Sequence, residues 1–370
     1  CAFPLLHNWL QDAYPQATIT GTVFLSAFTT KLAVYALARG FPGTEALIGI
    51  GVVMTLFPIF FAVIENDLRK VLCYSLNNQL GFMVVGIGIG TELALNGAVA
   101  HAFVHILYKA LLFMSMGAVL YRTGTIRATD LGGLYRSMPW TAAFCIVGAM
   151  SISAFPLFSG FVAKSLTMSA VISGYYVWTF VGLLVASAGV MEHSGIKIPY
   201  FAFFGRDSGI RCQEAPIHMC LAMGIAAALC IGIGCFPEPL YALLPYPVDY
   251  EPYADFGHSL TQVQLLLFAA LAFAVLLRTG LYPPEQNAIN LDTDWLYRRL
   301  APKVVCSVMN NLVIVTNGLS AATRSVGRAL MRSVIRHYGP EGTLARTWPT
   351  GSMVLWIAVL LAASLVLYFV

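Results

Sequence analysis

The sequence predicts an all-α protein that crosses a membrane many times. Of its 370 residues, 58% are hydrophobic and only 10% are charged, whereas about 25% of residues are charged in ordinary soluble domains. Apolar runs of about 20 residues, the length that a helix needs to cross a bilayer, recur along the whole chain. These observations exclude a soluble monomer. A formal net charge of +4 is too small to indicate a nucleic-acid partner.

Nine apolar runs are long enough to predict nine crossings. In chain order they cover residues 18–38, 46–64, 71–89, 93–120, 140–172, 176–190 with an extension to 204, 217–236, 261–277 and 353–370. The fifth run is long and has Pro156 and Gly160 in its middle. Proline removes a helical hydrogen bond and its ring clashes with the preceding turn. We therefore expect the fifth crossing to be a broken helix.

Positive charge distinguishes the two sides of these crossings. When the connections are assigned alternately to two sides, 17 of the 21 Lys and Arg residues fall on one side and only Arg39 falls on the other. The remaining three, Lys31, Lys109 and Lys164, lie inside crossings. Because cytoplasmic loops carry an excess of positive charge, we expect the basic side to face the cytoplasm.

From residue 303 to residue 337 the pattern changes to an apolar residue at every third or fourth position. Four arginines hold another face: Arg324, Arg328, Arg332 and Arg336. This period predicts an amphipathic helix about 50 Å long. Its charged face favours a position along the cytoplasmic interface, either against partner subunits or against lipid alone.

Three regions are therefore expected. They are a membrane bundle of eight crossings (1–280), a cytoplasmic linker with the amphipathic helix (281–347) and a final crossing (348–370). The loop 237–260 receives no specific role. The chain opens at Cys1 inside an apolar motif with no basic leader, so we expect further helices upstream of it.

Three titratable residues follow one face of the fourth predicted crossing. His101, His105 and Lys109 are spaced by four residues, which places them on one helix face over about 12 Å. Histidine changes charge near neutral pH, and a desolvated lysine can exchange a proton at cellular pH. We interpret this ladder as a proton relay. Packing residues held by hydrogen bonds, and a histidine pair that ligates a metal or haem, are the alternatives.

Two further lysines, Lys31 and Lys164, lie inside predicted crossings. Each opposes insertion by about 2.5 to 3.5 kcal/mol unless it faces protein or water. Both are therefore assigned to the relay, with snorkelling to a helix end as the alternative for Lys164. The polar run Asn77, Asn78 and Gln79 in the third crossing lines a wet path or pins helices together by hydrogen bonds.

No pattern typical of a catalytic centre or a metal site is present. The sequence contains no Ser/His/Asp arrangement, Walker loop or zinc spacing, and its eight cysteines form no CxxC pair. We interpret the cysteines as small buried hydrophobes. Glu192, His193 and Lys197, near the cytoplasmic end of the sixth crossing, are interpreted as an ordinary interfacial cluster.

Four motifs in a fixed order resemble a known family. They are FPLLHNWLQDAYP (3–15), DLRKVLCYS (67–75), HAFVHILYKALLF (101–113) and FSGFVAK (158–164). Over roughly residues 1–280, their order and spacing are similar to those of the proton-translocating membrane subunits shared by respiratory complex I and the multisubunit Mrp-type cation/proton antiporters. The wording of residues 13–15 and 26–31 looks most like the antiporter D-type subunit.

The resemblance implies two inverted bundles of five helices, each with one broken helix, around an axis of buried charges. It matches Lys31 to the central relay lysine and Lys164 to the lysine of the second broken helix, on the exit path. His105 and Lys109 match the bridge toward the second bundle, with His101 one turn further along. The family's glutamate and lysine of the first bundle then fall before residue 1, so we expect the second bundle to be complete and the first truncated.

The resemblance implies a proton-translocating subunit that exchanges protons for Na+ or another monovalent cation inside a larger membrane complex. The interfacial helix and final crossing are instead similar to the distal complex I subunit. A proton-pumping subunit of a quinone reductase or membrane-bound hydrogenase is therefore the first alternative, and a haem-binding subunit that uses His101 and His105 is the second. We expect no cofactor, a location in the bacterial inner membrane, and no enzyme activity of the chain outside a complex I-like assembly.

Overall fold

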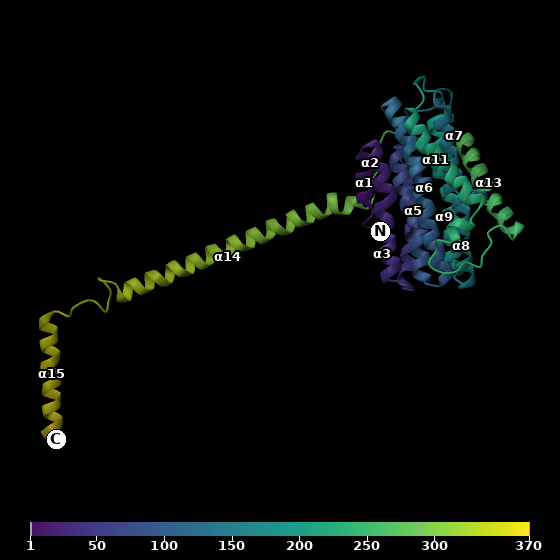
Figure 1. Ribbon diagram of the computed structural model, residues 1–370. Coiled ribbons are helices and arrows are strands. Elements are labelled where there is room, and N and C mark those ends of the chain that lie inside the picture. Colours follow the sequence, from purple (N-terminus) through teal and green to yellow (C-terminus); the bar gives the residue numbers. More distant parts are fainter. Residues whose placement is uncertain (1, 289, 370) are drawn as a thin grey trace. The chain divides into compact units, whose positions relative to one another are not determined.

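The computed structural model describes residues 2–288 and 290–369, in two units that divide between Asp294 and Trp295. The described residues form helices and no named strand (Figure 1), so the predicted all-α class is confirmed. Cys1 and Val370, which belong to the predicted first and last segments, lie outside the described residues. Each unit is described by itself below.

The first unit contains the helices of the membrane bundle. In chain order they are α1 (Asn8–Gln16), α2 (Ile19–Phe24), the π-helix η1 (Leu25–Thr29), α3 (Thr30–Gly40), α4 (Ala46–Ile64), α5 (Leu68–Ile89), α6 (Glu92–Thr123), the 3₁₀ turn η2 (Leu134–Arg136), α7 (Pro139–Ile152), α8 (Ser159–Ser173), α9 (Val177–Val190), the π-helix η3 (Met191–Ile196), α10 (Lys197–Pro199), the π-helix η4 (Tyr200–Phe204), α11 (Ile217–Cys235), α12 (Glu238–Tyr241) and α13 (Phe256–Thr279).

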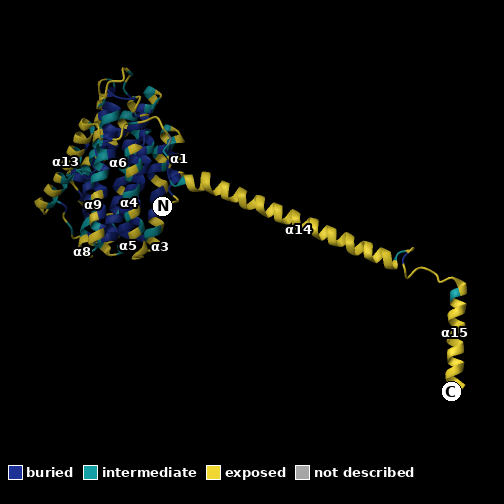
Figure 2. Ribbon diagram, turned by 180° about the vertical axis from the view of Figure 1, so that it is seen from behind, coloured by how far each residue is buried: buried dark blue, intermediate teal, exposed yellow. Residues whose placement is uncertain are grey.

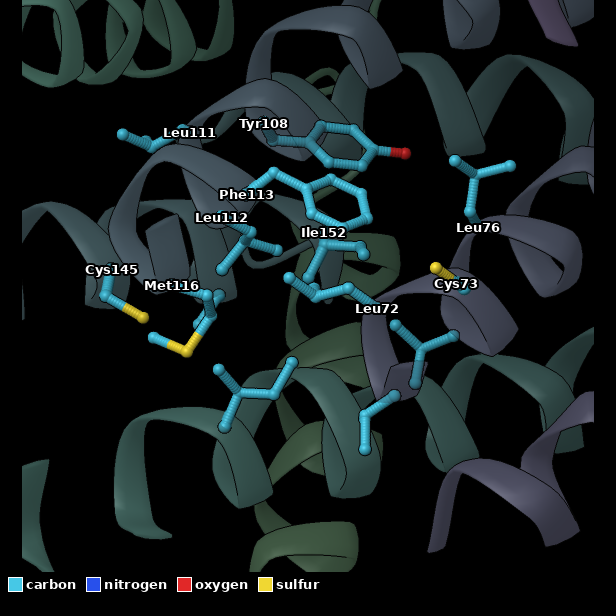
Figure 3. Packing of buried hydrophobic residues seen from close by; sticks show 14 of the residues in the cluster. Leu72, Cys73, Leu76, Tyr108, Leu111, Leu112, Phe113, Met116, Cys145 and Ile152 are labelled. Carbon is cyan, nitrogen blue, oxygen red and sulfur yellow. The ribbon is translucent and has the colours of Figure 1, made fainter. Parts of the chain in front are cut away.

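Helices α5 and α6 form the centre of this unit. In their most apolar stretches, 94% of α5 and 67% of α6 is buried, against only 11% of α13. Figure 2 shows the same order, with dark blue helices inside and exposed residues outside. Leu72, Cys73 and Leu76 of α5 and Tyr108, Leu112 and Phe113 of α6 belong to this core (Figure 3).

Capping and close packing explain how α5 is held. The Asp67 carboxylate accepts hydrogen bonds from the backbone N–H groups of Arg69 and Lys70 at its start, which satisfies two donors that lack helical partners. Gly90, with φ of 74°, ends the helix in the left-handed region that glycine tolerates. A Cβ on Gly81 would lie 2.5 Å from the carbonyl oxygen of Gly51, so small residues allow α4 and α5 to approach closely.

Among the described residues, nine helices are long and apolar enough to cross a membrane. The number equals the predicted one, but the members differ. The fifth predicted crossing is divided into α7 and α8, neither of which is long enough by itself. The helical stretch Leu296–Tyr338 meets the criterion of length and composition instead, because the apolar half that follows Lys303 carries few charges. Its interfacial position therefore stays a prediction.

The second unit contains the π-helix η5 (Leu296–Leu300), α14 (Ala301–Tyr338) and α15 (Thr350–Phe369). Nearly all of its described residues are exposed (Figure 2). The predicted helix over 303–337 is present and continuous. Cys306 lies exposed on α14, so the interpretation of the cysteines as buried hydrophobes is wrong there, although Cys73, Cys145 and Cys230 are buried.

Candidate functional site

Helix α6 carries the predicted ladder through the centre of the bundle. The Thr91 side chain accepts a hydrogen bond from the backbone N–H of Ala94 at its start, and Gly124 ends it with a φ of 73°. Between these ends, His101, His105 and Lys109 are each completely buried. The spacing of four residues therefore places three titratable side chains on one sealed face of a helix.

His101 belongs to a small polar network between α5 and α6. Its Nε2 atom lies 3.1 Å from Oε1 of Gln79 and 2.9 Å from the hydroxyl of Tyr108. The Tyr108 hydroxyl also lies 3.2 Å from Gln79 Oε1. That hydroxyl has one proton, so it donates either to His101 or to Gln79, according to which nitrogen of His101 carries hydrogen. The network can reverse its direction when the proton on His101 moves.

His105 and Lys109 are buried without hydrogen-bond partners among the described residues. This holds for both ring nitrogens of His105 and for Nζ of Lys109. Buried polar atoms are nearly always satisfied by protein or by water, so these atoms mark the part of the bundle where water is expected. Charges on Lys31, Lys109, His101 and Lys164 all lie within electrostatic reach of His105. The five predicted relay residues therefore surround one interior region.

Lys31 reaches that region from α3, directly after the π-helix η1. Its side chain is 7% exposed, and Nζ donates to the carbonyl oxygen of Ser26 at 2.5 Å and to Oγ1 of Thr30 at 3.3 Å. A π turn displaces backbone carbonyls from their ordinary pairing four residues on. The widened turn thus supplies an acceptor for a buried ammonium group.

Lys164 is held at the break between α7 and α8. Residues 153–158, including Pro156, separate the two helices. Nζ of Lys164 donates to the carbonyl oxygen of Ile152, the last residue of α7, at 3.0 Å, and lies 5.1 Å from the centre of the Phe82 ring. Carbonyls in the last turn of a helix lack helical donors and carry partial negative charge. The break therefore provides a site for a cation, and the side chain is only 3% exposed.

The polar run on α5 joins this region only in part. Asn78 donates to the carbonyl oxygen of Thr55 at 2.5 Å, and Gln79 Nε2 donates to Asn78 Oδ1 at 2.9 Å. Asn77 is buried, and neither its Oδ1 nor its Nδ2 has a partner among the described residues. Asn78 thus pins α5 to α4, whereas Gln79 extends to His101. Both interpretations given to this run find a residue that fits.

The pair of imidazoles does not have the geometry of a haem-ligand pair. Their rings lie 6.3 Å apart at 64° and project from adjacent turns of one helix face. They therefore cannot take the two opposite faces of one macrocycle. In the described part of the chain, no group of three or more His, Cys, Asp or Glu residues is arranged to hold a metal ion.

Two features of this interior were missed in the sequence. Tyr108 stands seven residues after His101, a spacing that two helical turns bring to the same face, so its place in the network was readable. Glu192, His193 and Lys197 do not form an ordinary interfacial cluster, because His193 and Lys197 are completely buried. Residues 191–204 are largely π-helical, and no sequence pattern announced that irregularity.

A polytopic helical bundle with Lys and His side chains along its buried axis defines a class of membrane protein that handles protons or ions inside the bilayer. Comparison with known families agrees with that class. Residues 1–190 match the family described as NADH:quinone oxidoreductase/Mrp antiporter, transmembrane. The chain belongs to this family.

Curated relatives come from both branches of that description. The chain is 27% identical to hydrogenase-4 component B of Escherichia coli over 75% of its own length and 48% of that protein. It is 32% identical to the D-type subunit of the Na(+)/H(+) antiporter of Alkalihalophilus pseudofirmus over 65% of its length and 50% of that protein. It is 30% identical to NADH-ubiquinone oxidoreductase chain 5 of Sus scrofa over 54% and 34%. The chain thus spans about half the length, or less, of these relatives.

Two solved structures share the fold. The Mrp complex from Dietzia sp. DQ12-45-1b matches with a TM-score of 0.59 at 19% identity, over 76% of this chain and 59% of that one. The membrane-bound sulfane sulfur reductase, an archaeal respiratory membrane complex, matches with a TM-score of 0.61 at 22% identity, over 98% and 65%. At these identities the likeness establishes the architecture alone.

Proposed function

We propose that the chain is the proton-translocating subunit of a multisubunit antiporter that exchanges protons for Na+ or another monovalent cation. One observation carries the proposal: His105 lies within electrostatic reach of Lys31, Lys109, His101 and Lys164. These residues come from α3, α6 and α8, and all are at least nine-tenths buried. The complex is proposed to lie in the bacterial cytoplasmic membrane, with the basic loops inside.

The arrangement suits stepwise proton transfer. Like charges repel strongly where water is scarce, so two neighbouring members of the row are not readily protonated together. Arrival of a proton at one member therefore favours release from the next. In this mechanism Lys31 serves the middle of the row, His101, His105 and Lys109 carry the proton along α6, and Lys164 receives it at the break in α7 and α8.

The test uses the assembled complex in everted membrane vesicles. A pulse of Na+ or K+ should drive proton movement, followed with a pH-sensitive dye. Lys109→Ala should abolish most of this movement while the complex still assembles. Lys303→Ala removes an exposed lysine from α14 and should leave transport unchanged. Full transport by Lys109→Ala would contradict the proposal and favour a packing role for the ladder.

A redox-driven pump is the second candidate, and the C-terminal part of the chain favours it. The sulfane sulfur reductase chain covers 98% of this protein, against 76% for the Mrp chain, so its match includes most of α14 and α15. The same vesicles distinguish the two functions. Cation-driven proton movement without an electron donor supports the antiporter, whereas movement only during oxidation of a donor such as NADH supports the pump.

A further inference from the structure

A second buried charged cluster lies where α4 ends and α5 begins. Lys197 is completely buried. Its Nζ donates to the carbonyl oxygens of Ala62, Val63 and Glu65 at 3.2, 2.5 and 2.8 Å. It also forms an ion pair with the carboxylate of Glu285 at 2.8 Å. The carbonyls belong to the end of α4, which explains why a cation is stable there.

Glu285 reaches this cluster from the segment that follows α13. Burial raises the pKa of Glu285 above its ordinary value of 4.5, although Lys197 lowers it. Glu192 and Glu65 also lie within electrostatic reach of Lys197, and Glu65 lies 3.8 Å from Nζ of Lys70 on α5. The cluster thus combines acids and bases at an end of the bundle, next to the connection that carries Arg69 and Lys70.

A chain of short hydrogen bonds leads inward from this cluster. His193 is completely buried one helical turn before Lys197, and its Nδ1 lies 2.8 Å from Oγ of Ser194. Ser194 donates to Oγ of Ser75 on α5 at 2.6 Å. Nε2 of His193 has no partner among the described residues. Each of these groups can both give and take a proton.

The chain of hydrogen bonds ends beside the relay described above. Lys109 of α6 and Lys164 of α8 lie within electrostatic reach of His193, as does Lys197 of its own helix. Lys109 also lies within reach of Cys73, two residues before Ser75 on α5. The polar atoms without partners on His193 and Lys109 leave room for water between the two.

We propose that Glu285, Lys197 and His193 form a second proton-uptake site, which feeds the buried row at Lys109 through the hydroxyls of Ser194 and Ser75. The proposal rests on the proposed function of that row. In the transfer, His193 gives its Nδ1 proton to Ser194, Ser194 gives its hydroxyl proton to Ser75, and Ser75 gives its own, through water, to the neutral amine of Lys109. Each hydroxyl breaks one O–H bond and forms another, and Lys109 becomes an ammonium ion.

The alternative is a clamp that only fastens α9 to α4, and two variants of the assembled complex separate the roles. Ser75→Ala removes the hydroxyl link, and we expect the transport rate per assembled complex to fall about tenfold because water replaces it imperfectly. Ser115→Ala is the matched control, since Ser115 is an equally buried serine that donates to its own helix at Leu111. It should transport at the wild-type rate.

His193→Gln gives the second measurement. Glutamine keeps a hydrogen bond to Ser194 but does not titrate, so a clamp retains its function and a relay loses it. We expect a loss as large as that of Ser75→Ala, with unchanged thermal stability. Wild-type transport by Ser75→Ala and His193→Gln, in vesicles where Lys109→Ala is inactive, would overturn this second uptake site and leave the proposed function standing. Full activity of Lys109→Ala would overturn the proposed function itself.

Discussion

Three buried lysines share one device at the level of the residue. Lys31 donates to Ser26 beside a π-helix, Lys164 donates to the last residue of α7, and Lys197 donates to the end of α4. In each case a helix irregularity or end supplies carbonyl oxygens, so the ammonium is held by dipoles rather than by full charges. Weak, neutral partners let a lysine lose its proton without leaving a carboxylate unpaired, which suits a residue that must change charge.

Lys164→Met tests this device at the break. Methionine fills the volume of the lysine stem, so we expect the loss of the hydrogen bond to Ile152 to cost only about 1 kcal/mol. Transport should fall to background, because methionine carries no proton. Cation-driven proton flux and thermal unfolding of the purified complex measure the two effects. A variant that transports normally would assign Lys164 to packing.

His105→Ala should be milder than Lys109→Ala. Neither ring nitrogen of His105 has a partner among the described residues, so the substitution breaks no hydrogen bond between described groups. It leaves space that water can enter and use to bridge the gap, at a cost of about 2 kcal/mol or less. We expect partial transport, measured at several pH values. A loss equal to that of Lys109→Ala would show that the imidazole itself is required.

The residue scale also shows the limit of prediction from sequence. The spacing of His101, His105 and Lys109 was sufficient to place them together, because geometry within a single helix fixes that face. The contact of Gln79 with His101 depends on how α5 packs against α6, which no local pattern contains. Lys197 was misread for the same reason, since its partners lie on α4 and beyond α13.

At the scale of the element, the break between α7 and α8 depends on close approach of the backbone. A Cβ on Gly160 would overlap the carbonyl oxygen of Ser151, so Gly160→Ala must push the two half-helices apart. We expect a loss of about 3 kcal/mol, seen as a lower unfolding temperature. Gly49→Ala on α4 is the control, since nothing lies within 4 Å of its Cβ position. Equal stability of the two variants would contradict the close contact.

Pro156 announced an interruption, but the sequence did not place it. The predicted crossing 140–172 contains two helices that end and begin around six residues, and the boundary depends on which backbone groups find partners. The π-helices after Phe24 and Val190 gave even less warning, because their residues are ordinary apolar and small ones. Element existence followed from apolar length, whereas element irregularity is set by tertiary packing.

The segment after α13 is a second element that packing explains. His7 donates to Oδ2 of Asp292 at 2.9 Å, and the Tyr74 hydroxyl donates to the same oxygen at 3.0 Å. Burial alone raises the pKa of Asp292, but the hydrogen bonds from His7 and from the backbone N–H of Thr293 hold it below the ordinary 3.8. A depressed pKa contributes stability above the ordinary value, and this contribution is lost as pH falls through the lowered one.

Asp292→Asn should therefore loosen this segment at neutral pH. One buried charged acceptor is lost, which we expect to cost about 1 to 3 kcal/mol, seen as reduced hydrogen-exchange protection of residues 290–294. In the wild type, protection corrected for the intrinsic rate should stay constant down to about pH 4 and then fall. Unchanged protection in Asp292→Asn would show that the contact to His7 and Tyr74 does not hold the segment.

At the scale of the whole first unit, the basic connections gather on one side of the bundle. Asp67 and Arg127 form an isolated backbone bridge, Arg136 lies 3.8 Å from Asp207, and Ser208 N–H donates to Gly132. Three connections far apart in the sequence thus meet. On the opposite side, Gly43 N–H donates to the carbonyl of Ile87 near the end of α5. The alternation assumed from the sequence agrees with these contacts.

This arrangement makes the predicted orientation testable. An excess of Lys and Arg keeps connections on the cytoplasmic side, so the loops near Arg69, Arg127 and Arg206 should be cytoplasmic. Arg69 itself is 3% exposed and donates to the Pro15 carbonyl, so labels belong at Arg127→Cys and Arg206→Cys, both exposed positions. Thr44→Cys, exposed on the opposite side, is the matched control.

An impermeant thiol reagent should label Arg127→Cys and Arg206→Cys only in everted vesicles, and Thr44→Cys only in intact cells, with the native cysteines replaced. The physical reason is that a connection with several arginines resists transfer against the membrane potential, by about 2.3 kcal/mol per charge for 100 mV. Labelling of Arg206→Cys from outside intact cells would invert the bundle. The cluster at Lys197 and Glu285 would then take up protons from the outer side, because it shares this end with Arg69 and Lys70.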